Sequence, residues 1–345
     1  MNPSGTARDG VSILDQIAIT SSTISVCAAI CTRDRPKLLS RALQSLLAQS
    51  TAPAAILVVD NAPTTDASMI LVRDEFPGVR YVRELAEGLD FARNRALRET
   101  DCDVVAFMDD DVVVSNEWVA ATQTVFRQYD RVVVCTGRVD ALSQETEGQR
   151  LFEANAGFSC GDESIHLPAD ARRTRRGLVR PMIARSISMG AGCSFAVRRS
   201  VALELGGFDE ALDLGAALPG GGDHDMIWRA LQAGYEVIYE PTVHAWHDHR
   251  EVFDAAVNQI LGHNRATVAM LTKALATTKG MPRLVVLTYL GWRLVKPGVR
   301  LARRALQRDP LPSAVLLRLW WACWRGLVAY PAARRLATRR ALTVN

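Results

Sequence analysis

VVAFMDDD, at residues 104–111, decides the fold of this chain, because an apolar run ends directly in three aspartates. Such a short apolar run is typical of a strand that is buried on both faces. Similar runs occur at residues 25–31, 56–59 and 79–82, and helical patterns separate them. Repeated strand–helix–strand units predict an α/β fold, with a mainly parallel sheet flanked by helices on both faces.

Polar side chains follow several of these expected strands. Thr32 follows the first strand, Asp60 the second, and the aspartate triplet the fourth. In open α/β sheets, ligands bind beyond the carboxyl ends of the strands. We therefore expect a ligand site where these residues meet.

The composition indicates a globular chain with two parts of opposite charge. Apolar residues make up 48% and charged residues 23% of the 345 residues, which argues against disorder. From residue 265 on there are 16 Lys/Arg and one acid, Asp309, whereas the residues before hold 25 basic and 36 acidic side chains. We expect a flexible leader at residues 1–22, a catalytic domain at residues 23–264 and a basic helical extension at residues 265–345.

The cysteines and the first residues indicate the compartment. Seven cysteines are present, and none forms a CxxC pair. This argues against a zinc or disulfide framework and favours reduced core cysteines. The chain starts without a basic stretch followed by an apolar run, so no secretory signal is expected. These features predict a cytoplasmic protein.

The triplet Asp109-Asp110-Asp111 suggests metal binding. Carboxylates directly after a buried strand are held close together, and two of them one residue apart can bind a hard divalent ion. Such an ion can neutralise charge that builds up on a leaving diphosphate. A solvated turn is the alternative, because Asp is common where strands end.

Two later stretches add candidate polar groups. Gly220-Gly221-Gly222-Asp223-His224-Asp225 precedes a helical pattern, where a plain loop with an N-cap is the alternative. In Trp246-His247-Asp248-His249, the two histidines would share one face of an extended segment. Either imidazole could complete a metal site, and a structural role is the alternative.

The order of these pieces resembles the family-2 glycosyltransferases, whose nucleotide-binding fold is called GT-A. The similar stretches follow the family's order over about residues 24–250, and seven of them in succession make the resemblance specific. They are AICTRDRP, ILVVDNAPTTD, GLDFARNRAL, VVAFMDDDVVVSNEWV, GAGCSFAVRRSVALELGGFDEAL, GGGDHDMIWRALQAGYEVIYEP and WHDHR.

The resemblance implies a nucleotide site on the first half of the chain. It places the base and ribose of the donor at Thr32 and Asp60, where Asp60 is an acceptor that suits a uracil N–H. Arg93 resembles the family's basic contact beside the nucleotide. The full set implied in this way is Thr32, Arg33, Asp60, Arg93, Asp109 and Asp110.

The resemblance also implies a site for a divalent ion, Mn²⁺ or Mg²⁺. Asp109 and Asp111 match the family's DxD pair, in which Asp111 is the expected ligand and Asp109 contacts ribose or metal. His247 matches the metal-binding histidine that follows a late strand, and His249 is the fallback.

Asp223 matches the Asp of the family's Glu-Asp motif, which acts as catalytic base. Inversion requires an acceptor hydroxyl opposite the leaving diphosphate and a carboxylate within hydrogen-bond reach to take its proton. Asp225 is the alternative base. The family's Glu is replaced by Gly222, so a contact to the acceptor is expected to differ.

The expected function is therefore inverting, metal-dependent transfer of a sugar from a nucleotide diphosphate, UDP above all, to an acceptor hydroxyl. The acceptor class stays open between a glycan, a lipid-linked glycan and a natural product. One alternative is a nucleotidyltransferase acting on a sugar phosphate, but CTRDRPKLL lacks the glycines of its loop. Another is a non-catalytic binding protein on the same fold, against which the intact Asp109, Asp111, Asp223 and His247 argue.

The extension resembles amphipathic helices at residues 284–295, 299–306 and 314–330, and it holds four of the seven tryptophans. Arg318 and Arg325 interrupt its longest apolar stretch, so a spanning helix is not expected. Basic helices rich in Trp and Leu favour in-plane binding to an anionic membrane, here the inner face of the cell membrane. No motif indicates nucleic acid. Packing on the catalytic domain or on a second copy is the alternative.

Overall fold

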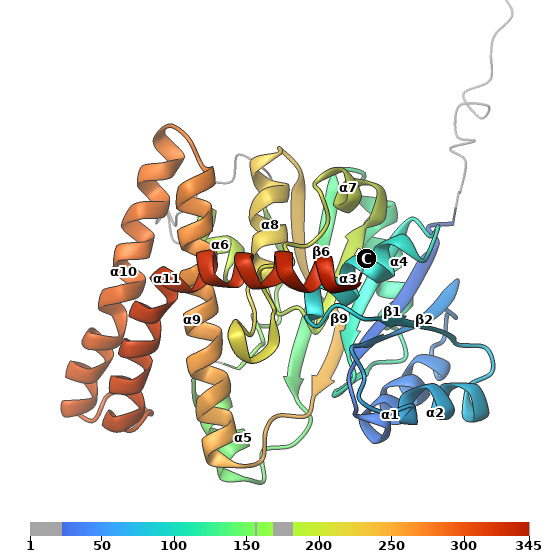
Figure 1. Cartoon of the computed structure of the whole chain (residues 1–345), viewed down its shortest axis with the longest axis horizontal. Coiled ribbons are helices and arrows are strands. Elements are labelled where there is room, and N and C mark those ends of the chain that lie inside the picture. Colours follow the sequence, from blue (N-terminus) through green and yellow to red (C-terminus); the bar gives the residue numbers. More distant parts are fainter. Residues whose placement is uncertain (1–22, 156, 168–181, 345) are drawn as a thin grey trace, which may run out of the picture.

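A computed structural model describes residues 23–155, 157–167 and 182–344 (Figure 1). The expected leader at residues 1–22 lies outside the described residues. At the centre is one nine-stranded sheet in the order β3-β2-β1-β4-β8-β6-β9-β5, with β7 paired to β9. The expected α/β fold with helices on both faces is confirmed.

The first half of the sheet is parallel. Its strands are β3 (Arg80–Glu84), β2 (Ala55–Asn61), β1 (Val26–Thr32) and β4 (Val104–Asp109). In this register Thr32 lies beside Asp60, and Cys31 lies beside Asp109. The polar side chains that the sequence places after these strands therefore meet at the carboxyl ends of the strands, which we call the strand edge.

The second half of the sheet is mixed. It consists of β8 (Ser194–Arg198), β6 (Val132–Ala141), β9 (Glu236–His247), β5 (Val112–Val114) and β7 (Ile165–Leu167). The β6–β9 pair is parallel, and the other pairs of this half are antiparallel. The sequence predicted a parallel arrangement from the runs that form β1, β2, β3 and β4, and these four strands are parallel.

Alternate residues of β1 pack against opposite layers of helices, as the strand's period of two requires. Val26, Ala28 and Ile30 join the core under α1 (Pro36–Leu47), α2 (Ala67–Glu75) and α4 (Trp118–Gln128). Cys27, Ala29 and Cys31 join the core under α3 (Leu89–Arg98), α7 (Arg199–Glu204) and α8 (Gly222–Gln232). All seven cysteines are free.

The three C-terminal helices pack against the part of the molecule that holds the sheet, which we call the body. They are α9 (Phe253–Thr277), α10 (Met281–Ala305) and α11 (Ser313–Val344), and the short α5 (Glu147–Ala154) and α6 (Met182–Ser186) also contact this group. The domain boundary expected at residue 265 falls inside α9. Residues of all three helices share a core with Leu212, Leu214 and Trp228 of the body.

Helix α11 is the longest element and crosses the molecule. Figure 1 shows it changing direction, with its first part beside α10 and its last part across the front of the body. Pro331 lies inside the helix, which accounts for a bend because its ring removes one hydrogen bond of the helical ladder. Near its end, Arg340 pairs with Glu87 at 2.5 Å.

The sequence correctly predicts helices in the extension but divides them differently. Residues 284–295 and 299–305 belong to one helix, α10, which continues through Pro297, and Leu306 is its C-cap. Among the described residues, no helix is both long enough and apolar enough for a membrane crossing.

Candidate functional site

Thr32 and Asp60 form the part of the site that the parallel strands position. The Thr32 hydroxyl donates to Oδ2 of Asp110 at 2.6 Å. Asp60 is fully buried; its Oδ2 accepts from the Tyr81 hydroxyl at 2.8 Å, and its Oδ1 has no hydrogen-bond partner among the described residues. Burial raises the pKa of Asp60. A buried acceptor of this kind is suited to an N–H of a ligand.

The aspartate triplet is held by an arginine that the sequence reasoning missed. The Arg35 guanidinium lies 2.5 Å from Oδ1 of Asp110 and 3.0 Å from Oδ2 of Asp111. Burial raises the pKa of Asp110 to about 7 and that of Asp109 to about 6, where Asp111 adds to the rise. Arg33, which the sequence predicts as a nucleotide contact, pairs with Glu87 at 2.5 Å.

A chain of two histidines leads from Glu153 to Asp111. Oε1 of Glu153 lies 2.7 Å from Nε2 of His249, whose Nδ1 lies 2.9 Å from Nδ1 of His247. Since a carboxylate accepts, His249 carries its proton on Nε2 and accepts at Nδ1 from His247. Nε2 of His247 is then an unprotonated nitrogen, and it lies 3.4 Å from Oδ1 of Asp111.

These two facing atoms fit a divalent cation. Oδ1 of Asp111 is buried and has no hydrogen-bond partner among the described residues. Burial lowers the pKa of His247 to about 4, so the imidazole is neutral near pH 7 and cannot donate from Nε2. Two lone pairs that face each other repel unless a cation lies between them. Within the described part of the chain, no group of three or more His, Cys, Asp or Glu side chains forms a cation site. Mg²⁺ is commonly held by only one or two carboxylates of the protein, and substrate phosphates and waters complete its coordination.

Asp223 lies in the first turn of α8, as the sequence predicts. Its Oδ2 accepts from the backbone N–H of Gly192 at 2.9 Å, and its Oδ1 accepts from the N–H of His224 at 2.7 Å. Burial alone would raise the pKa of Asp223, but His224 and Arg93 outweigh burial and hold it below its usual range. The carboxylate is therefore ionised near pH 7.

Asp90 explains why position 222 is glycine. A Cβ at Gly222 would lie 1.9 Å from Oδ2 of Asp90. Asp90 is fully buried, and its Oδ1 accepts from Arg93 at 3.0 Å. A carboxylate from α3 therefore occupies the space into which a side chain at position 222 would project. Burial, together with Asp213, raises the pKa of Asp90 well above its usual range.

A cavity of about 750 Å³ is lined both by Asp109, the first residue of the triplet, and by Asp223 on α8. Asp109, Asp223 and Arg93 line it, and Arg93 is buried between Asp90 and Asp213. Burial alone would lower the pKa of Arg93, but Asp213 and Asp90 raise it. The cavity brings together residues from β4, α3 and α8.

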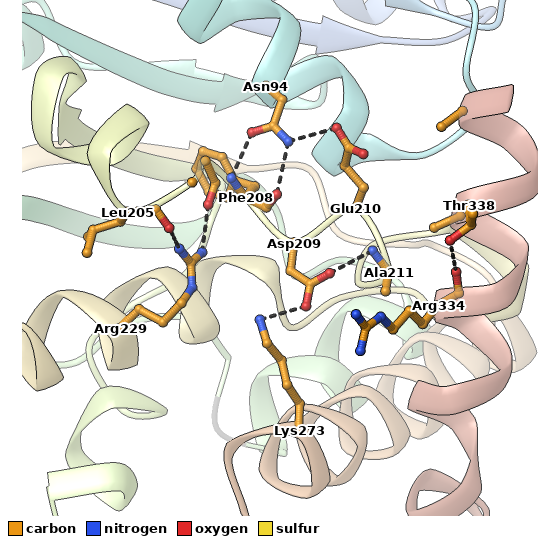
Figure 2. Close-up of a pocket in the computed structure, with 14 residues that line it drawn as sticks. Asn94, Leu205, Phe208, Asp209, Glu210, Ala211, Arg229, Lys273, Arg334 and Thr338 are labelled. Atoms are coloured by element: carbon orange, nitrogen blue, oxygen red, sulfur yellow. Dashed lines mark hydrogen bonds and ion pairs between the residues drawn. The ribbon is translucent and has the colours of Figure 1, made fainter. Parts of the chain in front are cut away.

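Asp225 has a different environment. Its carboxylate lies 2.7 Å from Arg229 and 2.7 Å from Lys273, and it is not among the described residues that line the cavity with Asp223. Figure 2 shows these two cations at a second cavity, of about 540 Å³. Arg229 donates there to the backbone oxygen of Leu205, and Lys273 pairs with Asp209 at 2.6 Å. These contacts make Asp225 part of an ion-pair network with Arg229, Lys273 and Asp209.

Sequence comparison identifies the family of the chain. The family model described as Glycosyl transferase family 2 matches residues 27–206, which is more than half of the chain. The chain belongs to glycosyl transferase family 2. The matched stretch includes the aspartate triplet and ends before Asp223, so the roles of Asp223 and His247 depend on the geometry described above.

Two curated relatives are similar to this family member over different spans. A pre-mycofactocin glycosyltransferase of Mycobacterium tuberculosis is 26% identical over 201 residues, which is 56% of this chain and 37% of that protein. The chain thus spans little more than a third of that relative's length. The succinoglycan biosynthesis protein ExoM of Rhizobium meliloti is 27% identical over 259 residues, covering 73% of this chain and 72% of that protein.

Solved structures confirm the GT-A-type fold. The mannosyltransferase PcManGT from Pyrobaculum calidifontis, in complex with GDP-Man and Mn²⁺, aligns with a TM-score of 0.55 at 20% identity over 90% of this chain and 85% of that one. GalNAc-T7 with UDP, GalNAc and Mn²⁺ aligns with a TM-score of 0.50 at 16% identity over 85% of this chain and 59% of that one. At these identities the likeness concerns the fold alone.

Proposed function

We propose that this family member is an inverting glycosyltransferase that moves a sugar from a nucleotide diphosphate to an acceptor hydroxyl. The observation that carries the proposal is the shared cavity, in which the ionised Asp223 faces the same space as Asp109 of the triplet. Family membership favours this function over a nucleotidyltransferase. The presence of Asp109 and Asp223 in one cavity favours it over a non-catalytic binding protein.

The chemistry follows from the position of Asp223. Its carboxylate takes the proton of the acceptor hydroxyl while the hydroxyl oxygen bonds to the anomeric carbon of the sugar. The bond from that carbon to the diphosphate oxygen breaks, and its electron pair leaves with the diphosphate. Attack opposite the leaving group inverts the configuration. A positioned general base of this kind contributes about 10²–10⁴-fold to a rate.

The nucleotide would bind at the edge formed by β1, β2 and β4, with Asp60 reading the base. Oδ1 of Asp60 suits the N–H of uracil, and UDP is the donor nucleotide that we propose, although one solved relative holds GDP-Man and the other UDP. Mn²⁺ or Mg²⁺ would be held by Asp111 and His247, with Asp109 beside them. When bound, the ion supplies positive charge to the leaving diphosphate.

The extension is proposed to rest on an anionic membrane at the cytoplasmic face. Leu317, Trp321, Trp324 and Val328 form an exposed apolar stripe along α11, at helical spacing. Trp321 alone is 67% exposed. Tryptophan and leucine beside arginines favour the membrane interface. The packing of α11 on α9 is compatible with this role, because it uses a different face of the helix.

Asp223→Asn is the test of the catalytic proposal. We expect product formation to fall by about 10²–10⁴-fold, because the amide cannot take a proton. Stabilisation by UDP with Mn²⁺ in thermal unfolding should stay unchanged. Proton NMR of the anomeric centre in the wild-type product reports inversion or retention.

Asp225→Asn is the matched control, since both residues lie in the first turn of α8. It removes one charge from the ion-pair network. We expect a lower melting temperature, whereas the turnover of the folded enzyme should stay near that of the wild type. Near-normal turnover of Asp223→Asn, or a product with retained configuration, would contradict the proposal.

A further inference from the structure

One wall of the catalytic cavity comes from the extension. Tyr289, Arg293, Lys296 and Arg300 of α10 line the same cavity as Asp223. Their spacing of four, three and four residues places them on one face of the helix. This wall is built from a part of the chain that lies beyond the sequence stretch matched by the family.

Two cations of this wall have no carboxylate partner among the described residues. Arg300 is neutralised by Asp309 through contacts of 2.8 and 3.0 Å. Arg293, by contrast, donates only to the neutral Asn264, at 2.8 Å, and its buried Nε has no partner. Lys296 has no hydrogen-bond or ion-pair partner within the described part of the chain.

These cations line the same cavity as the proposed base. Asn264, the partner of Arg293, follows His263 on α9, and both residues line the cavity. His263 interacts electrostatically with Asp223. The cavity therefore has carboxylates at the triplet end and uncompensated positive charge at the α10 end.

We propose that Arg293 and Lys296 bind a phosphate or diphosphate group of the acceptor, so that the acceptor substrate is anionic. This inference rests on the proposed function. A cationic pair about one turn apart matches a group that carries more than one negative charge, and a guanidinium binds phosphate oxygens through paired hydrogen bonds. A neutral acceptor would leave the half-buried Arg293 without a counter-charge in the cavity.

The phosphate could belong to a lipid or to a soluble sugar phosphate. Next to the cavity-lining face, α10 exposes Leu284, Trp292, Val295 and Val299 to solvent. These exposed apolar side chains of α10 and its cationic residues thus lie on neighbouring faces of one helix. A phosphate at the surface of a membrane would reach the cavity past this helix.

The test uses inorganic pyrophosphate and the full-length protein in a chelator, which excludes metal-bridged binding at the triplet. We expect binding in calorimetry, with affinity falling at least about tenfold in Lys296→Gln and in Arg293→Gln, as for a lost charged hydrogen bond. Arg283→Gln, an exposed arginine on the same helix, is the matched control and should bind as the wild type does. Competition by vesicles with phosphatidic acid, but not by phosphatidylcholine vesicles, would identify a lipid phosphate. Competition by a sugar phosphate alone would identify a soluble acceptor.

Absence of pyrophosphate binding, or equal loss in all three variants, would overturn the inference. Failure of this inference and failure of the proposed function are distinguishable. If the enzyme releases UDP rapidly with a neutral sugar acceptor, and if Lys296→Gln leaves that rate unchanged, the glycosyltransferase stands and the anionic acceptor does not.

Discussion

Two regions of the molecule differ in charge and in construction. The first is the strand edge at Thr32, Asp60 and residues 109–111, and the second is the α10 wall at Arg293 and Lys296. Asp109 of the first region lines the same cavity as the second. The edge is acidic, and neighbouring strands of a parallel sheet hold it in register. The wall is basic, and only the packing of three helices on the body places it there. A nucleotide with its cation suits the first region, and an anion suits the second.

This difference teaches how one cavity can serve two substrates of similar charge. A donor diphosphate and a phosphate-bearing acceptor repel each other and compete for any cation. Separate regions would avoid that competition, because the donor would use a metal ion at the carboxylates whereas the acceptor would use fixed side chains. Asp223, which lines the same cavity, remains ionised because His224 and Arg93 lower its pKa.

The largest expected effect on ligand binding is that of Asp111→Ala, which should separate the two regions. The affinity for UDP in the presence of Mn²⁺, measured from the shift in thermal unfolding, should fall by more than about 100-fold. Even residues that only support a metal ligand contribute about 10–100-fold to metal affinity. Pyrophosphate binding in a chelator should be unchanged. Asp74→Ala, at an exposed ion pair with Arg73, is the control. Equal stabilisation by UDP with and without the ion would contradict the metal-bridged edge.

Glu153→Ala tests the histidine chain at the strand edge. Loss of this carboxylate frees His249 to adopt the other tautomer, which turns an unprotonated Nε2 of His247 into a donor. We expect Mn²⁺ affinity to fall by about 10–100-fold in titration calorimetry. Glu145→Ala, at an exposed position before α5, should have no effect. An unchanged affinity in Glu153→Ala would show that His249 does not orient His247.

Gly222→Ala tests whether Asp90 occupies the space beside position 222. The added methyl overlaps Asp90, and overpacking of this kind costs about 1–3 kcal/mol of unfolding free energy. Adding Asp90→Ala should relieve the clash, so that the double variant is more stable than the sum of the single effects predicts. Chemical denaturation of the four proteins measures this coupling. Strict additivity would mean that the two side chains do not share that space.

The smallest expected effect is a pH dependence at the α10 wall. Burial, with Arg293 and Arg300 on the same helix, lowers the pKa of Lys296 to about 8, while Cys323 and Asp309 act in the opposite direction. Lys296 is therefore charged below pH 8 and neutral above it. Pyrophosphate affinity should fall by up to about tenfold between pH 7 and 9. Lys296→Arg should remove that fall, since arginine stays charged; the same fall in Lys296→Arg would assign it to another group.

Much of the strand edge was predictable because its signals are local. The runs at residues 25–31, 56–59 and 104–108 correspond to β1, β2 and β4, and a parallel sheet brings the ends of neighbouring strands together. The position of Asp223 in the first turn of a helix was equally readable from the glycines before it. Gly221 has a φ of 102°, which other residues rarely adopt.

Other parts of the site could not be read in this way. Arg35 belongs to a turn whose direction no periodicity reveals, and the contact with Asp110 and Asp111 spans 75 or more positions of sequence. The space taken by Asp90 at Gly222 depends on how α3 packs beside α8. The roles of Asp225 and Lys273 in one ion-pair network likewise depend on the packing of α8 and α9.

The sequence by itself determined the strands, the polar residues that end them and the basic, tryptophan-rich character of the extension. These features repeat at short range, so the period of two or of 3.6 residues and the composition carry them. Only the tertiary structure decided that the extension forms a wall of the catalytic cavity. The packing of α9, α10 and α11 on the body places Arg293, Lys296 and Arg300 on one face of α10 that lines the cavity. The buried apolar side chains decide which side of each helix faces the body, and this packing joins segments that are far apart in the sequence.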